Sequence, residues 1–200
     1  MQNQYDSDYF WQGDKIRLRP SQPQDWEAWY QEANDTEGIR RFNLEVRLPV
    51  TADMMREQAE KYAHFQNIEH ATIFAVETLE GELVGTITLH SRDEKNGRFG
   101  IGLRIYRPYR RCGYAEEAAR ILLRYGFYEL RCQKANSACM EHNEGSIRLH
   151  EKLGFKVEGR RRRHIYTNGR YYDDILFGMT REEFDEEEEQ RQTQSAGRED

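Results

Sequence analysis

The chain has 200 residues, with 36 acidic against 30 basic side chains and a formal net charge of -6 at pH 7. This length supports one sizeable core, and no apolar run approaches the ~18 to 20 residues of a membrane span. The first residues, MQNQYD, lack the basic and apolar regions of a secretory signal, so we expect a cytoplasmic protein. Cys112, Cys132 and Cys139 show neither CxxC nor metal-ligand spacing, which predicts reduced thiols and no metal site.

The negative charge is concentrated at one end. Residues 182–200 hold nine acidic side chains and two arginines, so this segment carries -7 and the remainder about +1. A near-neutral body with an acidic end predicts three parts: an N-terminal extension over 1–14, a folded domain over 15–184 and a disordered acidic tail over 185–200. The tail either only solubilises the protein or contacts a cationic partner or substrate.

Strands and helices alternate along the chain without internal repeats. Alternating or short apolar runs predict strands over 16–20, 72–78, 83–90, 98–105, 133–140, 157–166 and 171–179. Helices are predicted after Pro23 and over 51–66, 113–130 and 146–153. Glu80-Gly81 and Asn168-Gly169 are typical of hairpin turns, the second of type I′. This order predicts a mixed α/β sheet with helices on both faces, while residues 34–50 show no pattern that defines their shape.

A turn between a strand and an amphipathic helix, within residues 107–127, carries Arg110, Gly113 and Ala115. Gly113 has no β-carbon and Ala115 is small, so the backbone can approach an anion closely. The unpaired amides of the first helical turn point at such an anion, and the helix dipole adds to the attraction. The turn therefore predicts a phosphate cradle, with an ordinary strand-to-helix turn as the alternative.

A second motif follows roughly 30 residues further on. It has the spacing Asn143-x-x-Ser146-x-x-x-His150-x-x-x-Gly154-Phe155. Together with the cradle, this pattern resembles the GNAT superfamily of acetyl-CoA-dependent N-acetyltransferases. The likeness continues through residues 165–184 and is greatest for the ribosomal-protein N-terminal and spermidine acetyltransferase branch. It covers about residues 15–184, and it implies a mixed, mostly antiparallel central sheet with a splayed pair of strands and helices on both faces.

By this resemblance the cofactor is acetyl-CoA, whose pantetheine arm lies between the splayed strands. Two strand glycines, Gly100 and Gly102, indicate either close approach of a ligand or a bulged or tightly packed strand. Asn143 is expected to cap its helix, and in the family it also contacts the cofactor. The cofactor-binding residues that the pattern implies are Leu103, Ile105, Arg110, Arg111, Cys112, Gly113, Tyr114, Ala115, Asn143 and Ser146.

The proton donor of the resembled family is usually a tyrosine four residues before the Gly-Phe pair, where this chain has His150. An imidazolium with a pKa of ~6.5 can protonate a thiolate whose conjugate acid has a pKa of ~8.5. Tyr114 is a second candidate donor, and packing is the alternative role for both residues. Gly100 replaces a glutamate common in relatives, so a water or another acid would deprotonate the amine. The candidate acids are Glu37, Glu45, Glu77, Asp173 and Asp174.

The implied reaction is direct attack of a primary amine on acetyl-CoA in a ternary complex. The acceptor is a polyamine, a protein N-terminus, an amino acid or a drug-like amine. The main alternative is a CoA-binding regulatory module without catalysis, because His150 and Gly100 replace familiar side chains. The basic run 160–163 invites a nucleic-acid interpretation, but alternate strand residues face opposite sides and the body is near neutral. We therefore expect neither a nucleic-acid nor a membrane partner, and a homodimer surface remains one alternative.

Overall fold

The computed structural model describes residues 9–64, 67–68 and 71–196. The strands are β1 (Ile16–Pro20), β2 (Asn67–Ile68), β3 (Ala71–Thr78), β4 (Leu83–Asp93), β5 (Arg98–Ile105), β6 (Lys134–Met140), β7 (Lys156–Thr167) and β8 (Arg170–Thr180). Seven of them form an open sheet in the order β1-β3-β4-β5-β6-β8-β7, and β2 pairs with β3. Within the described residues only β5 and β6 pair in parallel, so the predicted mixed, mostly antiparallel sheet is confirmed.

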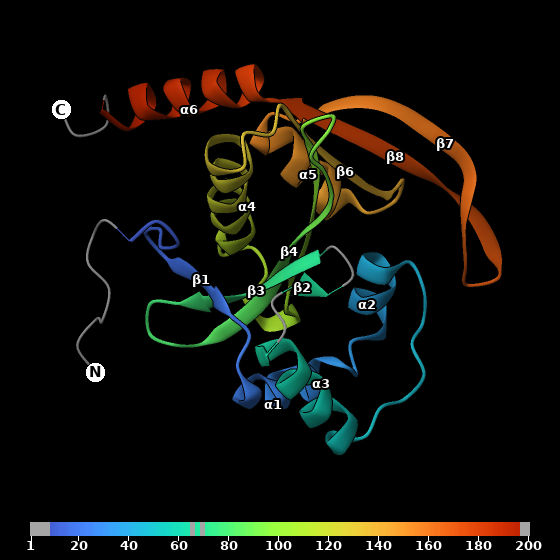
Figure 1. The fold of residues 1–200 in the computed structure, drawn as a ribbon. Helices are drawn as coiled ribbons and strands as arrows, with labels where there is room; N and C mark the ends of the chain where they lie inside the picture. Colours follow the sequence, from blue (N-terminus) through green and yellow to red (C-terminus); the bar gives the residue numbers. More distant parts are fainter. Residues whose placement is uncertain (1–8, 65–66, 69–70, 197–200) are drawn as a thin grey trace.

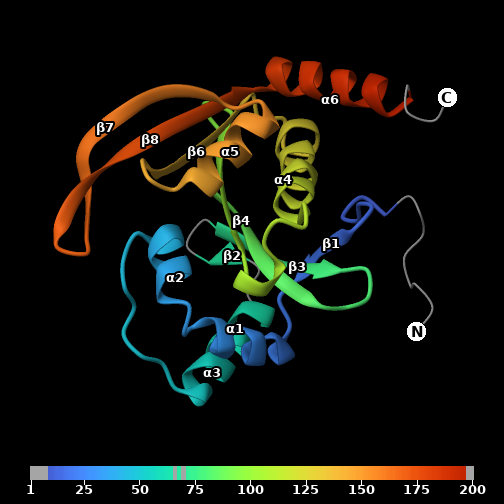
Figure 2. The same ribbon diagram turned by 180° about the vertical axis from the view of Figure 1, so that it is seen from behind.

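Helices cover both faces of this sheet, as predicted (Figures 1 and 2). They are α1 (Trp26–Glu32), α2 (Thr36–Asn43), α3 (Ala52–His64), α4 (Tyr114–Arg124), α5 (Glu144–Leu153) and α6 (Arg181–Ala196). A single 3-10 turn precedes α1, and a π-helical turn extends α4 to Glu129. In the part of the chain described, no helix combines the length and the apolar character that a bilayer crossing requires.

The central strands separate a core face from a second face by the two-residue alternation of a strand. On β4, Ile87 and Leu89 belong to the buried core that α4 covers, while Thr86 and Thr88 face the side of α1 to α3. On β5 the same alternation turns Ile101 toward the core and Arg104 toward the opposite side. The second face is therefore lined by polar side chains, although it lies under three helices.

The predicted splay lies between β5 and β6. These strands pair only from Arg98 opposite Lys134 to Gly100 opposite Asn136, and both then continue without pairing to one another. The long hairpin of β7 and β8 arches away from the body on the far side of β6 (Figure 1). Its turn at Asn168 and Gly169 has positive φ at both residues, 51° and 77°, as a type I′ turn requires. The hairpin prediction is confirmed.

The segment without a predicted shape contains a helix. In α2, the Asp35 side chain accepts a hydrogen bond from the Gly38 amide at 3.1 Å, and Leu44 ends the helix with φ at 66°. Asp35 also receives a hydrogen bond from Arg110, 75 positions away in sequence, at 2.7 Å. This second contact is tertiary, so the local sequence did not reveal it.

The acidic end also differs from expectation, because residues 185–196 continue α6 where a disordered tail was predicted. Phe184 is fully buried in the core and anchors the helix. Glu188 then accepts a hydrogen bond at 2.7 Å from Arg120, whose side chain is only 7% exposed. The composition of the segment suggested disorder, but this buried cation provides a partner that composition does not show. Residues 197–200 lie outside the described residues.

The end of the predicted N-terminal extension packs against the domain. Trp11 stacks on Phe74 with ring centroids 5.0 Å apart and also contacts Tyr125. Its carbonyl accepts a hydrogen bond from the Leu18 amide at 2.7 Å. Residues 9–14 thus contribute to the sheet edge, and residues 1–8 lie outside the described residues.

Candidate active site

The cradle forms at the start of α4, where the sequence placed it. Gly113 is the N-cap residue with φ at 87°, in the left-handed region that glycine adopts without strain, and no side chain caps the helix. Arg111 has φ at 68°, so left-handed residues alternate through the turn. Such a backbone turns successive N–H groups into one concavity, and the first-turn amides of the helix add to it. This geometry fits a diphosphate.

Cations surround this turn. The Lys15 ammonium donates a hydrogen bond to the Cys112 carbonyl at 3.3 Å and would lie 3.1 Å from a β-carbon at position 113. Arg111 and Cys112 are exposed beside it. The two acids in the first turn of α4 are engaged elsewhere, since Glu117 accepts from the Lys15 amide and Glu116 pairs with Lys152. Sequence reasoning missed Lys15, which reaches the turn from 97 positions away.

Arg110 does not point into the cradle but connects it to its surroundings. Its Nε donates to the Ile105 carbonyl at 3.0 Å, and its Nη2 donates to Asp35 at 2.7 Å. Burial alone would raise the pKa of Asp35, but the Gly38 amide and Arg110 together hold that pKa below its usual range. The predicted cofactor ligand therefore serves here as a link between the turn, β5 and the start of α2.

The free edge of β5 faces the gap between the splayed strands. The carbonyl of Ile101 accepts from Ser137 Oγ on β6 at 3.4 Å, and that of Ile105 accepts from Arg110. Alternate residues of a strand direct their backbone groups to the same edge, so the N–H and C=O of Leu103 also face the gap. This position suits the predicted bond to a pantetheine arm, whereas the carbonyl of Ile105 already has a partner.

Asn143 and Ser146 lie at the start of α5, as predicted. The Asn143 side chain caps the helix by accepting from the Ser146 amide at 3.4 Å. The Ser146 hydroxyl lies 3.5 Å from His150 Nδ1, and the Ser146 carbonyl lies 2.7 Å from the same nitrogen. Because a carbonyl only accepts hydrogen bonds, Nδ1 carries the proton.

His150 itself is part of the core, 6% exposed. Its ring stacks on Phe177 with centroids 4.3 Å apart and meets the edge of Phe155. Burial lowers the pKa of His150, and the hydrogen bond to Ser146 offsets this only in part. A neutral imidazole whose one proton is bound to a carbonyl has no proton to give to a thiolate. These contacts differ from those expected of the general acid and favour the packing alternative.

Tyr114 and Ala115 occupy the first turn of α4, next to Gly113. Tyr114 is half-buried and packs against the hydrophobic core, and its hydroxyl has no hydrogen bond to a described residue. The cradle would hold the diphosphate end of the cofactor, and the thioester lies at the other end of the pantetheine arm. With the cofactor in this orientation, Tyr114 would lie nearer the phosphates than the departing sulfur.

The two strand glycines make room for a histidine on the neighbouring strand. His90 of β4 pairs with Gly100 of β5, and a β-carbon at position 100 would lie 2.4 Å from His90 Cε1. At Gly102 a β-carbon would lie 3.5 Å from Phe42 and 3.8 Å from His90. The imidazole thus covers position 100. Sequence reasoning missed His90, although Gly100 indicated that another group approaches this strand closely.

The surroundings of His90 keep it neutral. Burial lowers the pKa of His90, and the backbone of Ile101 offsets the effect in part. Its Nδ1 lies 3.0 Å from the Ser91 hydroxyl, which can donate to the nitrogen or accept from it. A neutral imidazole is a proton acceptor at neutral pH.

The acids named as candidate bases are mostly engaged in ion pairs. Glu77 is buried and accepts hydrogen bonds from Arg17 and Arg19, which hold its pKa low against the effect of burial. The remaining pairs are Glu37 with Arg40, Asp173 with Arg160, and Asp174 with Arg161. Only Glu45 is exposed without such a contact among the described residues. Arg160 and Arg161 are therefore partly neutralised, which weakens the nucleic-acid interpretation further.

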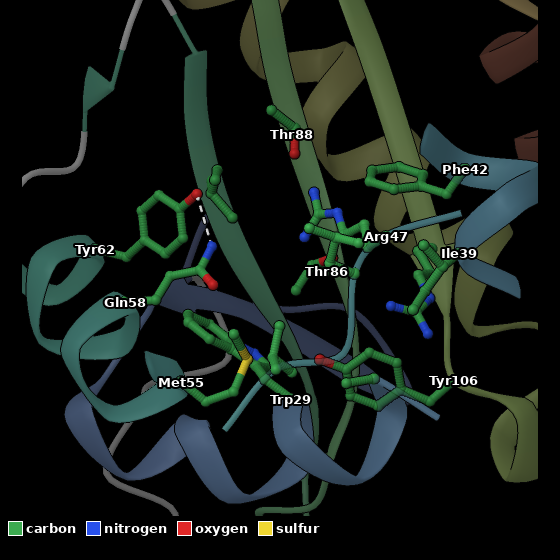
Figure 3. A pocket seen from close by; sticks show the side chains of 15 residues that line it. Trp29, Ile39, Phe42, Arg47, Met55, Gln58, Tyr62, Thr86, Thr88 and Tyr106 are labelled. Carbon is green, nitrogen blue, oxygen red and sulfur yellow. Dashed lines mark hydrogen bonds between the residues drawn. The ribbon is translucent and has the colours of Figure 1, made fainter. Parts of the chain in front are cut away.

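A pocket of about 160 Å³ opens on the second face of the sheet, beneath α1 to α3 (Figure 3). Its floor includes Thr86 and Thr88 of β4, and Gln58 Nε2 donates to the Tyr62 hydroxyl at 3.2 Å on its wall. The other lining residues are Trp29, Ala33, Ile39, Phe42, Arg47, Leu48, Val50, Met55, Ile73, Arg104 and Tyr106. His90 borders it, because it shares the strand face of Thr86 and Thr88 and lies near Phe42.

A phosphate cradle beside a gap between strands, with a pocket across the same strand, is the arrangement of an enzyme that binds an acyl-coenzyme A and a second substrate. Comparison with known proteins gives the same class. The model of the acetyltransferase (GNAT) domain matches residues 15–156. The chain belongs to the GNAT acetyltransferase family, and it is an N-acetyltransferase that uses acetyl-CoA.

Individual relatives agree with this assignment. The SPbeta prophage-derived uncharacterized N-acetyltransferase YokL of Bacillus subtilis is 41% identical over 176 residues, 88% of this chain and 96% of that protein. The spermidine N(1)-acetyltransferase of Escherichia coli K12 is 28% identical, over 80% of this chain and 83% of that protein. The crystal structure of a GNAT-family acetyltransferase from Bacillus anthracis has a TM-score of 0.73 at 26% identity, covering 86% and 98% of the two chains. The predicted family and branch are confirmed.

Proposed function

We propose that this enzyme transfers the acetyl group of acetyl-CoA directly to a small primary amine within a ternary complex. The main support for the proposal is that β5 borders both the gap between the splayed strands and the pocket. Its edge at Leu103 faces the gap between the splayed strands, while its face at Arg104 lines the pocket. Cofactor and acceptor would occupy opposite sides of one strand at the same time, so no acyl-enzyme is needed.

Binding in this complex begins with the diphosphate at Gly113 and Lys15. The pantetheine arm follows the free edge of β5, where Leu103 supplies an N–H and a C=O, and Asn143 lies on the other side of the gap at the start of α5. The family's acetyl-CoA supplies the thioester. The thioester end then lies near the point where β5 and β6 part, at Gly100.

His90 is the proton acceptor in this proposal, because its neutral ring lies over Gly100 at the border of the pocket. It takes a proton from the incoming ammonium, and the nitrogen lone pair attacks the carbonyl carbon. The carbon–sulfur bond then breaks, the new amide nitrogen gives up its second proton to water, and the thiolate takes a proton from water. His150 positions α5 against Phe177 and does not donate a proton.

Acetylation of a mixed amine panel with isotopically labelled acetyl-CoA, followed by mass spectrometry, tests the proposal. We expect label on at least one amine and one free thiol released for each acetylated molecule. Gly113→Glu should abolish acetyl-CoA binding in calorimetry, because it places bulk and negative charge where the diphosphate lies.

Gly81→Glu is the matched control for the cradle variant. Gly81 also has a positive φ, 95°, and open space around it, so it shares the backbone strain but lies in the β3–β4 turn. Unchanged affinity of Gly113→Glu, or absence of label from every amine, would contradict the proposal.

A further inference from the structure

The pocket under α1 to α3 has an unequal charge distribution. Among its described lining residues there are two arginines, Arg47 and Arg104, and no aspartate or glutamate. Arg47 enters from the loop after α2 and points toward Thr86 and Thr88 in Figure 3. A polyamine brings several positive charges and would find no carboxylate among these residues to pair with them.

Buried donors in the pocket also lack acceptors. Arg104 is held by Glu32, whose carbonyl and carboxylate accept from Nη2 at 3.0 and 3.2 Å, yet its Nε has no hydrogen-bond partner. Trp29 Nε1 is also buried and meets no acceptor within strict hydrogen-bond geometry, but its hydrogen-bond interaction with the Tyr106 hydroxyl opposes the rise that burial causes in the pKa of Tyr106, so the Nε of Arg104 is the clearer case. Buried polar groups of this kind are rare in folded proteins, and a ligand that accepts hydrogen bonds would satisfy them.

The remaining walls limit the size and character of the ligand. Ile39, Met55 and Ile73 provide apolar surface, and the volume of about 160 Å³ accommodates a small molecule. An anionic group near the arginines would leave the amine to reach His90 at the border of the pocket. The acceptor thus needs an amine at one end and acceptor oxygens at the other.

We propose that the acceptor is a small primary amine that carries an anionic oxygen group, a carboxylate or a phosphate, bound by Arg47 and Arg104. This inference rests on the proposed acetyl transfer and specifies its substrate class. The described lining residues include no acid, which disfavours a polyamine such as the substrate in the name of the Escherichia coli relative.

Steady-state kinetics with matched amines test the inference. Leucine is compared with leucine amide, phosphoethanolamine with ethanolamine, and both pairs with spermidine. We expect kcat/KM for the anionic member to exceed that of its neutral partner by ~10-fold or more, because a hydrogen bond to a charged group is typically worth that much. The pair with the larger ratio identifies carboxylate or phosphate as the preferred group.

Variants of two exposed arginines then locate the preference. Arg47→Gln should remove most of the preference for the anionic amine, measured as the ratio of kcat/KM values for the anionic and neutral members of a pair. Arg41→Gln is the control, because it makes the same change on α2 outside the lining residues, and it should leave this ratio unaltered. Equal or better turnover of spermidine and the neutral amines, or a ratio that Arg47→Gln does not change, would overturn the inference while acetyl transfer stands. Acetyl-CoA binding without acetylation of any amine would overturn the proposed function and this inference with it.

Discussion

Gly100→Ala tests the assignment of His90 without removing the imidazole. The added β-carbon would lie 2.4 Å from His90 Cε1 and 2.7 Å from Nδ1, whereas at Gly102 the nearest atom would be 3.5 Å away. The ring must therefore move by about 1 Å to restore ordinary contact at position 100, and a displacement of this size can lower a rate by ~10²-fold. This loss corresponds to ~2.7 kcal/mol of activation free energy.

The assay is initial-rate kinetics with a good amine acceptor from the panel. Gly100→Ala should lower kcat by ~10 to 10²-fold with acetyl-CoA affinity nearly unchanged, because the added β-carbon points at His90 on the pocket face of β5 and not into the gap that the cofactor would occupy. Gly102→Ala, on the same strand and facing the same side, makes only ordinary contacts and should retain most of the activity. Comparable activity of the two variants would refute the assigned role of His90. If the melting temperature falls equally in Gly100→Ala and Gly102→Ala, a difference in kcat between the two variants does not come from strand packing.

The remaining predictions concern the two histidines and α6. His90→Asn should lower kcat by ~10²-fold or more and remove the acidic limb of the kcat/KM profile; in the wild type this limb should lie below pH ~6.5, since burial lowers the pKa of His90. His150→Phe should keep most of kcat and preserve the stack on Phe177, and a large loss would restore the general-acid role. Burial lowers the pKa of His150, so the stabilising contribution of the neutral histidine is complete above pH ~6.5 and is lost as the pH falls toward the lowered pKa. The melting temperature of His150→Phe should therefore depend less on pH in that range than the melting temperature of the wild type does. Glu188→Gln should lower the melting temperature by several degrees, at ~2 to 4 °C per kcal/mol, because Arg120 loses the nearer of its two charged partners and keeps only Glu116. Exposed Glu189→Gln is the control, and equal melting temperatures would contradict the anchoring of α6.

The sequence predicts features whose physical causes are local. Asn143 caps α5 and Asn168-Gly169 forms a type I′ turn because both depend on neighbouring residues only. The cradle at Gly113 follows from the same reasoning, since a left-handed residue before a helix is readable from a glycine.

Features that depend on distant partners could not be predicted in this way. α2 is anchored by Arg110 and α6 by Arg120, and neither arginine is close in sequence to the helix that it holds. Gly100 indicated close approach by another group, but the identity of that group depends on the register that places His90 opposite it. The lining of the pocket comes from three helices and three strands, so its charge became visible only in the folded chain.

In the proposed reaction, acetyl-CoA and the amine react while both are bound. Initial rates measured while both substrates are varied test it most directly. A ternary complex predicts lines that intersect in a double-reciprocal plot, with acetylated amine and free CoA formed in equal amounts. Parallel lines, together with release of CoA in the absence of any amine, would indicate an acetyl-enzyme intermediate and would contradict direct transfer.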